Sequence, residues 1–117
     1  MTQSPRLPLI LTHRPIATGA ELDLFIDPAL LWFRGHFPDF LLLPGVVQLD
    51  WALTLAEQYL GLAAEPASQF QVKYKGAIFP GDSVTLALRH DPAKARLTFD
   101  YRRDGAVCSS GSVAVAP

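Results

Sequence analysis

Cysteine and charge are both scarce in this sequence. Cys108 is the only cysteine among 117 residues, which excludes an internal disulfide, a cysteine-based metal cage and a CxxC redox pair. Lys and Arg number 10 and Asp and Glu number 11, a formal net charge of −1. Because phosphate neutralisation supplies most of the affinity of nucleic-acid binders, a chain without a basic excess is not expected to bind nucleic acid.

Long hydrophobic runs are also missing. No stretch approaches the roughly 18 apolar residues of a membrane-spanning helix. The short apolar run at residues 7–11 is interrupted by Pro8 and is too brief for the core of a signal peptide. A lone cysteine is typical of a reducing compartment. The sequence therefore predicts a cytoplasmic protein with no membrane span.

Apolar residues, by contrast, make up 50% of the chain. No repeat or linker divides the sequence, so we predict a single domain over residues 1–117 with a short N-terminal arm at residues 1–6. A domain of this size can hold a real core, but few charges remain to cover its outside. The apolar excess predicts that a partner, a ligand or both hide part of the surface.

The pattern of polar and apolar residues predicts one long helix and several strands. A helix start is favoured at Pro44-Gly45, helical character continues over residues 46–60, and Gly61 is a typical stop. Apolar residues cover most of the circumference of this helix, which predicts burial on several sides. Strands are predicted at residues 7–12, 21–26, 69–74, 84–88, 96–101 and 106–116, with a helical turn at 29–33 and a tight turn at Asp104-Gly105.

The order of these elements is two strands, one buried helix and then four strands. We therefore predict an α+β fold in which one long central helix is wrapped by a curved antiparallel sheet of about five or six strands. Such a sheet leaves an edge to protect. Pairing with a second copy of the chain would protect that edge.

A histidine and an aspartate near the start of the helix could move protons. His36 lies in a glycine-flanked loop, and its imidazole titrates near neutral pH, which suits a general base. Asp50 follows fourteen positions later on the helix, where apolar neighbours would disfavour its charged form, as a general acid requires. Each has an ordinary alternative, because a loop histidine can simply bond to the backbone and Asp50 can simply belong to the polar helix face of Thr54, Glu57 and Gln58.

Gly45, where the helix begins, could complete a site. A glycine lets a substrate approach closely, and its N–H together with the helix dipole favours developing negative charge. The alternative is that Pro44-Gly45 merely turns the chain into the helix. Together, His36, Asp50 and Gly45 would supply a base, an acid and an oxyanion donor.

These residues resemble the β-hydroxyacyl-acyl-carrier-protein dehydratases of the hotdog fold, over about residues 20–115. The resemblance rests on the segments Gly35-His36-Phe37-Pro38, Pro44-Gly45-Val46, Leu49-Asp50, Val72-Lys73-Tyr74 and Pro80-Gly81-Asp82 and on their spacing. Residues 32–38 and 42–51 are most similar to the small dehydratases of aryl polyene pigment clusters. An aspartate at position 50 is typical of the family branch that also isomerises its product, although chains of that branch are usually longer.

The resemblance implies a reaction and a partner. The substrate would be a 3-hydroxyacyl thioester on the phosphopantetheine arm of an acyl carrier protein. His36 would remove the α-proton, Gly45 N–H would stabilise the thioester oxygen and Asp50 would protonate the departing hydroxyl. No metal or other cofactor is implied. In the family, the histidine and the carboxylate come from opposite subunits, which implies a homodimer or a heterodimer with a second hotdog subunit.

The resemblance also implies an acyl tunnel and a docking surface. Candidate tunnel residues are Trp32, Phe33, Phe37, Pro38, Phe40, Leu41, Val46 and Trp51, although such side chains can equally be ordinary core. Candidate bases for docking an acidic carrier protein are Lys73 and Lys75, which would share one strand face, and Arg102 and Arg103 near a hairpin turn. More often such residues are simply solvated surface.

The sequence departs from the family at three positions, where Asp39, Leu41 and Thr54 replace a glycine, a proline and a glutamine. These changes concern the pocket wall and put substrate shape and rate in question. Two other functions stay open: a hotdog thioesterase that hydrolyses the same thioester, and a non-catalytic hotdog subunit that supports a dehydratase partner. Retention of both His36 and Asp50 argues against an idle subunit.

Overall fold

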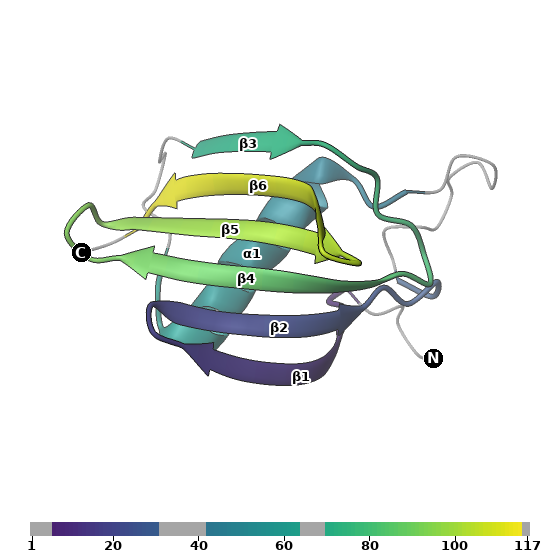
Figure 1. Cartoon of the computed structure of the whole chain (residues 1–117), viewed down its shortest axis with the longest axis horizontal. Coiled ribbons are helices and arrows are strands. Elements are labelled where there is room, and N and C mark those ends of the chain that lie inside the picture. Colours follow the sequence, from purple (N-terminus) through teal and green to yellow (C-terminus); the bar gives the residue numbers. More distant parts are fainter. Residues whose placement is uncertain (1–5, 31–41, 64–69, 116–117) are drawn as a thin grey trace.

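One helix lies across a six-stranded antiparallel sheet (Figure 1). The computed structural model describes residues 6–30, 42–63 and 70–115. The elements are β1 (Leu9–Ile16), β2 (Gly19–Phe25), α1 (Gly45–Leu60), β3 (Phe70–Tyr74), β4 (Ser83–Asp91), β5 (Arg96–Arg103) and β6 (Ala106–Ala114). Their order in the sheet is β1-β2-β4-β5-β6-β3. The predicted α+β architecture of a central helix wrapped by an antiparallel sheet is confirmed.

The predicted end of the helix and the predicted turns are determined by residues with particular backbone preferences. Gly61 ends α1 in the left-handed conformation, with φ 68°, which glycine adopts without strain. Asp104 and Gly105 both have positive φ, as the tight turn between β5 and β6 requires. Asp27 Oδ1 accepts the N–H of Ala29 at the predicted helical turn, most of which lies outside the described residues.

The first strand is longer than predicted. β1 continues to Ile16 and forms a hairpin with β2, although Pro15 lies inside it. A proline is tolerated there because β1 is an edge strand, where a missing N–H removes no ladder hydrogen bond. The pairing is also irregular between Ile10 and Thr12.

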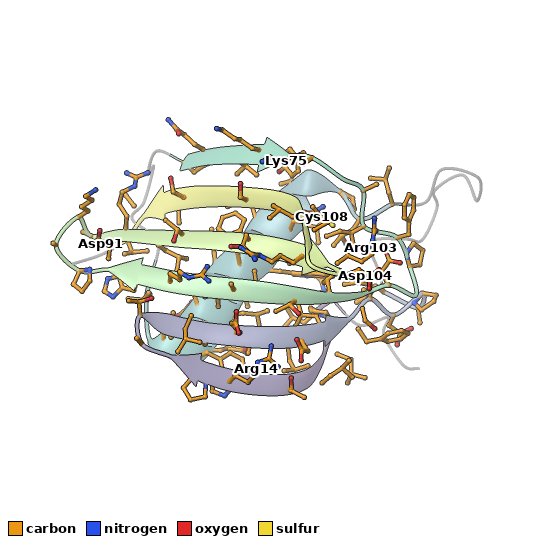
Figure 2. The ribbon with its side chains drawn as sticks, in the orientation of Figure 1. Arg14, Lys75, Asp91, Arg103, Asp104 and Cys108 are labelled. Atoms are coloured by element: carbon orange, nitrogen blue, oxygen red, sulfur yellow. The ribbon has the colours of Figure 1, made fainter. Side chains whose placement is uncertain are left out.

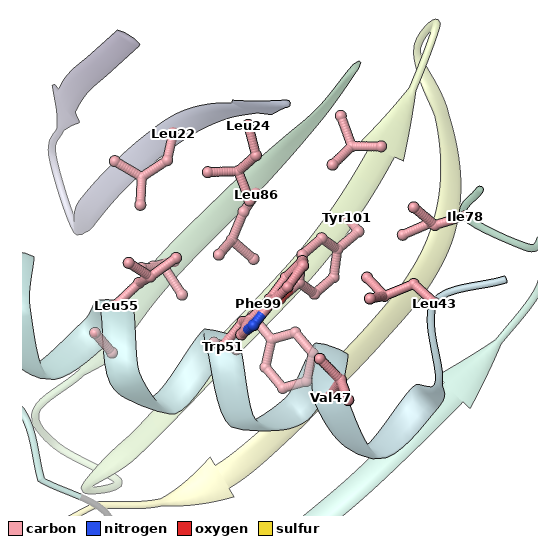
Figure 3. Packing of buried hydrophobic residues seen from close by; sticks show 14 of the residues in the cluster. Leu22, Leu24, Leu43, Val47, Trp51, Leu55, Ile78, Leu86, Phe99 and Tyr101 are labelled. Carbon is pink, nitrogen blue, oxygen red and sulfur yellow. The ribbon is translucent and has the colours of Figure 1, made fainter. Parts of the chain in front are cut away.

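The core lies between the helix and one face of the sheet. Its largest side chains include Trp51 of α1 and Phe99 and Tyr101 of β5, which gather between the two layers (Figure 3). The buried residues of α1 are Val47, Gln48, Trp51, Ala52, Leu55 and Ala56, which form one stripe. Leu49, Leu53, Tyr59 and Leu60 of the helix are partly buried against the same core. Within the described residues, the sheet covers one side of the helix, so burial on several sides stays a prediction. Within residues 6–30, 42–63 and 70–115, no helix is long and apolar enough to cross a membrane.

On the outer face of the sheet, Asp23 is the centre of a polar cluster with Arg14, which Figure 2 labels. Arg14 Nη1 and Nη2 donate to its carboxylate over 2.6 and 3.0 Å, and the hydroxyls of Thr12 and Thr85 donate over 2.5 and 2.8 Å. These hydrogen bonds, with that from Arg14 the largest cause, hold the pKa of Asp23 far below its usual range.

Replacing Asp23 by Asn is expected to reduce the acid sensitivity of the fold. Since the folded-state pKa is depressed, the carboxylate contributes stability above its unfolded pKa of about 4 and loses it as the pH falls further. Thermal unfolding at pH 7 and pH 2.5 should therefore differ less in Asp23→Asn than in the wild type. Asp104→Asn, at an exposed turn position, is the control and should keep the wild-type difference. If Asp23→Asn and the wild type show the same difference in unfolding temperature between pH 7 and pH 2.5, the stabilising role of the Asp23 carboxylate would be contradicted.

Candidate active site

The first turn of α1 has no side-chain cap. Pro44 occupies the N-cap position with extended backbone, and its carbonyl accepts the N–H groups of Val47 and Gln48 over 3.1 and 3.2 Å. Gly45 and Val46 precede these residues, in the part of a helix where backbone N–H groups have no intrahelical acceptor. The positive end of the helix dipole lies at the same place. The predicted oxyanion donor, Gly45, is therefore at the end of a helix that favours negative charge.

An open pocket of about 420 Å³ lies at this helix end. Its lining residues are Leu42, Leu43, Gly45, Gln48, Tyr74, Lys75, Gly76 and Ala77. The pocket joins the start of α1 to the segment that follows β3. Two residues predicted from the sequence for different roles, Gly45 and Lys75, thus line the same hollow.

Tyr74 lies directly over Gly45. A Cβ atom added at Gly45 would collide with the phenol ring of Tyr74, so any other residue would force this ring to move. The ring itself is half exposed, and partial burial raises the pKa of its hydroxyl. No local sequence pattern indicates this contact, because the two residues lie on different elements.

Gln48 is a buried polar residue that sequence reasoning missed. Its Nε2 donates to the Leu43 carbonyl over 3.2 Å, and its Oε1 accepts from Ser109 Oγ over 2.6 Å. Its main-chain carbonyl accepts from the Tyr101 hydroxyl over 2.6 Å. The helical spacing could have indicated its burial. Gln48 precedes Trp51 by three positions and Ala52 by four, so it lies on the apolar stripe of the helix.

Asp50 is exposed on the single chain, as are Glu57 and Gln58 on the same polar face. The predicted apolar surroundings are therefore not provided by the described part of its own chain. Burial is the main cause that raises the pKa of Tyr101, and the charge of Asp50 raises it further, which places this carboxylate near the buried network. The predicted role of Asp50 as general acid stays a prediction.

Most of the predicted tunnel lies outside the described residues. This holds for the base, His36, and for Trp32, Phe33, Phe37, Pro38, Phe40 and Leu41. Val46 is 73% exposed beside Gly45, as a substrate contact or an interface residue would be. Trp51 is fully buried in the core, and its indole N–H donates to the Arg6 carbonyl over 2.9 Å. Its predicted contact with substrate stays a prediction.

The four predicted docking bases have different surroundings. Arg102 Nε donates to Asp100 over 2.8 Å, and Arg103 Nη1 donates to Asp82 over 2.8 Å and to the Ala77 carbonyl over 2.7 Å.

The two lysines are both exposed. The prediction that they share one strand face is wrong, because β3 ends at Tyr74 and Lys75 follows it. Lys73 lines a hollow on the outer side of the sheet, whereas Lys75 lines the pocket at the start of α1.

A single long helix crossing a six-stranded antiparallel sheet is the hotdog arrangement that the sequence resemblance implies. A family model described as "ApeI dehydratase" matches residues 12–112. The chain therefore belongs to the ApeI-like dehydratase family. The matched span includes His36, Gly45 and Asp50, so the predicted family resemblance and the predicted dehydratase activity are confirmed.

Individual relatives agree with this assignment. The dehydratase heterocomplex ApeI:P from Xenorhabdus doucetiae contains a chain that is 34% identical, with a TM-score of 0.81 over 94% of this chain and 98% of that chain. An uncharacterized protein from Erwinia carotovora subsp. atroseptica is 35% identical, with a TM-score of 0.79 over 95% and 97%. A 3-hydroxyacyl-[acyl-carrier-protein] dehydratase FabZ from Clostridium perfringens is 30% identical over 73% of this chain and 68% of its own length.

Proposed function

We propose that this dehydratase removes water from a 3-hydroxyacyl thioester carried on the phosphopantetheine arm of an acyl carrier protein, in biosynthesis of the fatty acid or aryl polyene type. The observation that carries the proposal is the uncapped start of α1 at Gly45, which opens into a pocket in a chain of the dehydratase family. A thioester oxygen that gains negative charge during α-proton removal suits such a helix end.

The proposed reaction uses three groups of this chain. His36 takes the α-proton, and the electron pair of the broken C–H bond moves toward the thioester carbonyl, whose oxygen Gly45 N–H stabilises. The pair then forms the double bond between C2 and C3 as the C3–O bond breaks. Asp50 gives its proton to the departing hydroxyl, so water and a trans-2-enoyl thioester are released. These groups suffice for the proton transfers, and we propose that no metal or nucleotide takes part.

We further propose that a complete site needs a second hotdog subunit, either another copy or a related chain. Asp50 and Val46 are exposed on the single chain, so the apolar enclosure that the reaction needs has to come from elsewhere. The β3 edge is suited to pairing, since it carries the exposed side chains of Phe70 and Tyr74. The opposite edge, β1, has an irregular register and a proline, which disfavour pairing. A heterocomplex is also the form in which the Xenorhabdus relative is described.

The proposed activity is tested with purified protein and 3-hydroxyacyl-carrier-protein thioesters of several chain lengths, with and without an aromatic head group. Mass spectrometry should show loss of one water from the acyl chain. Release of free acid would instead indicate a thioesterase. Turnover that begins only when a second hotdog protein is added would indicate that the partner contributes to the site. The predicted cytoplasmic location stays a prediction.

Lys75→Glu is expected to raise KM for the carrier-protein substrate several-fold and to leave kcat nearly unchanged. The exposed Lys75 stands at the pocket mouth, where an acidic carrier protein would approach, and reversing its charge repels that partner. Lys94→Glu is the matched control, because Lys94 is exposed in the turn beside Asp91, at the other end of the sheet from Lys75 (Figure 2). Steady-state kinetics at low salt measure the effect. Equal KM values for the two variants would contradict docking at Lys75.

A further inference from the structure

Three side chains in a row across the sheet, Tyr74, Ser109 and Tyr101, face the first turn of α1. Ser109 of β6 pairs with Tyr74 of β3 on one side and with Tyr101 of β5 on the other. Tyr74 covers Gly45, Ser109 holds the side chain of Gln48, and Tyr101 holds its main-chain carbonyl. Three neighbouring strands thus contact one helical turn through residues in register.

Gln48 links this row to the chain that enters the helix. Its amide nitrogen binds the Leu43 carbonyl, and its amide oxygen binds Ser109. The Leu43 N–H in turn donates to the Ile78 carbonyl over 2.7 Å. Residues on both sides of Gly45 are therefore held in place, Gln48 by β6 and Leu43 by the segment between β3 and β4. The helix itself has no side-chain cap.

We propose that Gln48 is a positioning residue that holds the Gly45 N–H in the direction needed to stabilise the thioester oxygen. The inference rests on the proposed dehydratase reaction, in which Gly45 is the oxyanion donor. A donor of this kind is effective because it is already oriented when the charge develops. Gln48 borders the pocket, but it is only 3% exposed and both ends of its amide are bonded within the chain. It therefore acts through Gly45 and does not offer a free polar group to the substrate.

Gln48→Leu is expected to lower kcat about tenfold, with KM within about twofold of the wild type, because the lost interaction concerns the transition state more than the bound substrate. Thr98→Leu introduces a leucine at an exposed position of β5, away from α1, and should leave both constants unchanged. The shape of the pH profile of kcat/KM should also be preserved, since Gln48 carries no titrating proton.

Ser109→Ala provides a second, milder variant that leaves Gln48 in place. It should lower kcat by a smaller factor than Gln48→Leu. The double variant should lose no more than Gln48→Leu alone, because both substitutions break the same hydrogen bond. If Gln48→Leu does not fold, as judged by circular dichroism, Ser109→Ala decides the question.

The outcomes separate the inference from the proposed function. A folded Gln48→Leu variant with the wild-type kcat, or a loss confined to KM, would overturn the positioning role while the dehydratase reaction stands. An unchanged kcat in Ser109→Ala, or fully additive losses in the double variant, would overturn it as well. A wild-type protein that dehydrates none of the 3-hydroxyacyl thioesters, either alone or with the second hotdog subunit added, would overturn both.

Discussion

Asp50→Asn is expected to lower kcat by about a hundredfold to ten-thousandfold, the usual contribution of a general acid. Asparagine has nearly the same shape but no proton to give at neutral pH, so binding should survive while the departing hydroxyl leaves unassisted. His36→Ala should cause a loss of similar size by removing the base. Steady-state turnover of a 3-hydroxyacyl-carrier-protein thioester measures both effects.

Mixing the two inactive variants tests whether one site uses two chains. If the histidine of one subunit works with the aspartate of its partner, a dimer of His36→Ala with Asp50→Asn contains one intact site of two. After random subunit exchange, half of the dimers are mixed and each mixed dimer has one intact site of two. About a quarter of all sites are then intact, so about a quarter of the wild-type activity should return. Each variant alone, carried through the same exchange, is the control.

Two results would contradict the proposed roles or the shared site, and a third would change the experiment. Activity that survives in both single variants would mean that neither residue takes part in the chemistry. No recovery on mixing, with subunit exchange shown by mass spectrometry, would place both residues of a site on one chain. A wild-type protein that is active only with a different hotdog subunit would require the same experiment with that subunit present.

Trp51→Ala is expected to lower the free energy of unfolding by about 3–5 kcal/mol, the usual cost of removing a buried aromatic side chain. Trp51 is fully buried between α1 and the sheet, in the same core cluster as Phe99 (Figure 3). Its removal leaves a cavity and also releases the Arg6 carbonyl from the indole N–H. Denaturant or thermal unfolding measures the loss at a fixed protein concentration, because a dimer gains stability from association.

Trp51→Phe distinguishes a core residue from a tunnel residue. Phenylalanine keeps an aromatic ring but loses the hydrogen bond to Arg6, so stability should fall by less than in Trp51→Ala and the preferred acyl chain length should not change. A changed chain-length preference with unaltered stability would instead show that Trp51 lines the acyl tunnel, as the sequence predicted.

The helix could be predicted closely because its ends are set by local residues. Pro44 is suited to precede a first turn, and Gly61 accepts the left-handed backbone that ends α1. The first strand was predicted less well, since Pro15 is usually a strand breaker and only its edge position makes it acceptable. The candidate site could be predicted in part, because the spacing of His36, Gly45 and Asp50 is a local pattern of the sequence.

Other parts of the site depend on contacts between distant segments. Gln48 and Ser109 are sixty-one residues apart, and nothing in either local pattern indicates that they bind. The covering of Gly45 by Tyr74 requires that β3 pair with β6, the last strand, which places Tyr74 above the helix start. Such pairing depends on the packing of the whole sheet and has no local signal.

The sequence by itself therefore determined the family and the helix, and it predicted a base, an acid and an oxyanion donor, because these depend on residue type and short spacing. Only the tertiary structure decided which side chains hold Gly45 in place and which face of α1 is left uncovered, because both depend on the strand order and register. The scarcity of charge first suggested a hidden surface. In the structure, this surface corresponds to the exposed face of α1 with Val46 and Asp50, together with the β3 edge of the sheet.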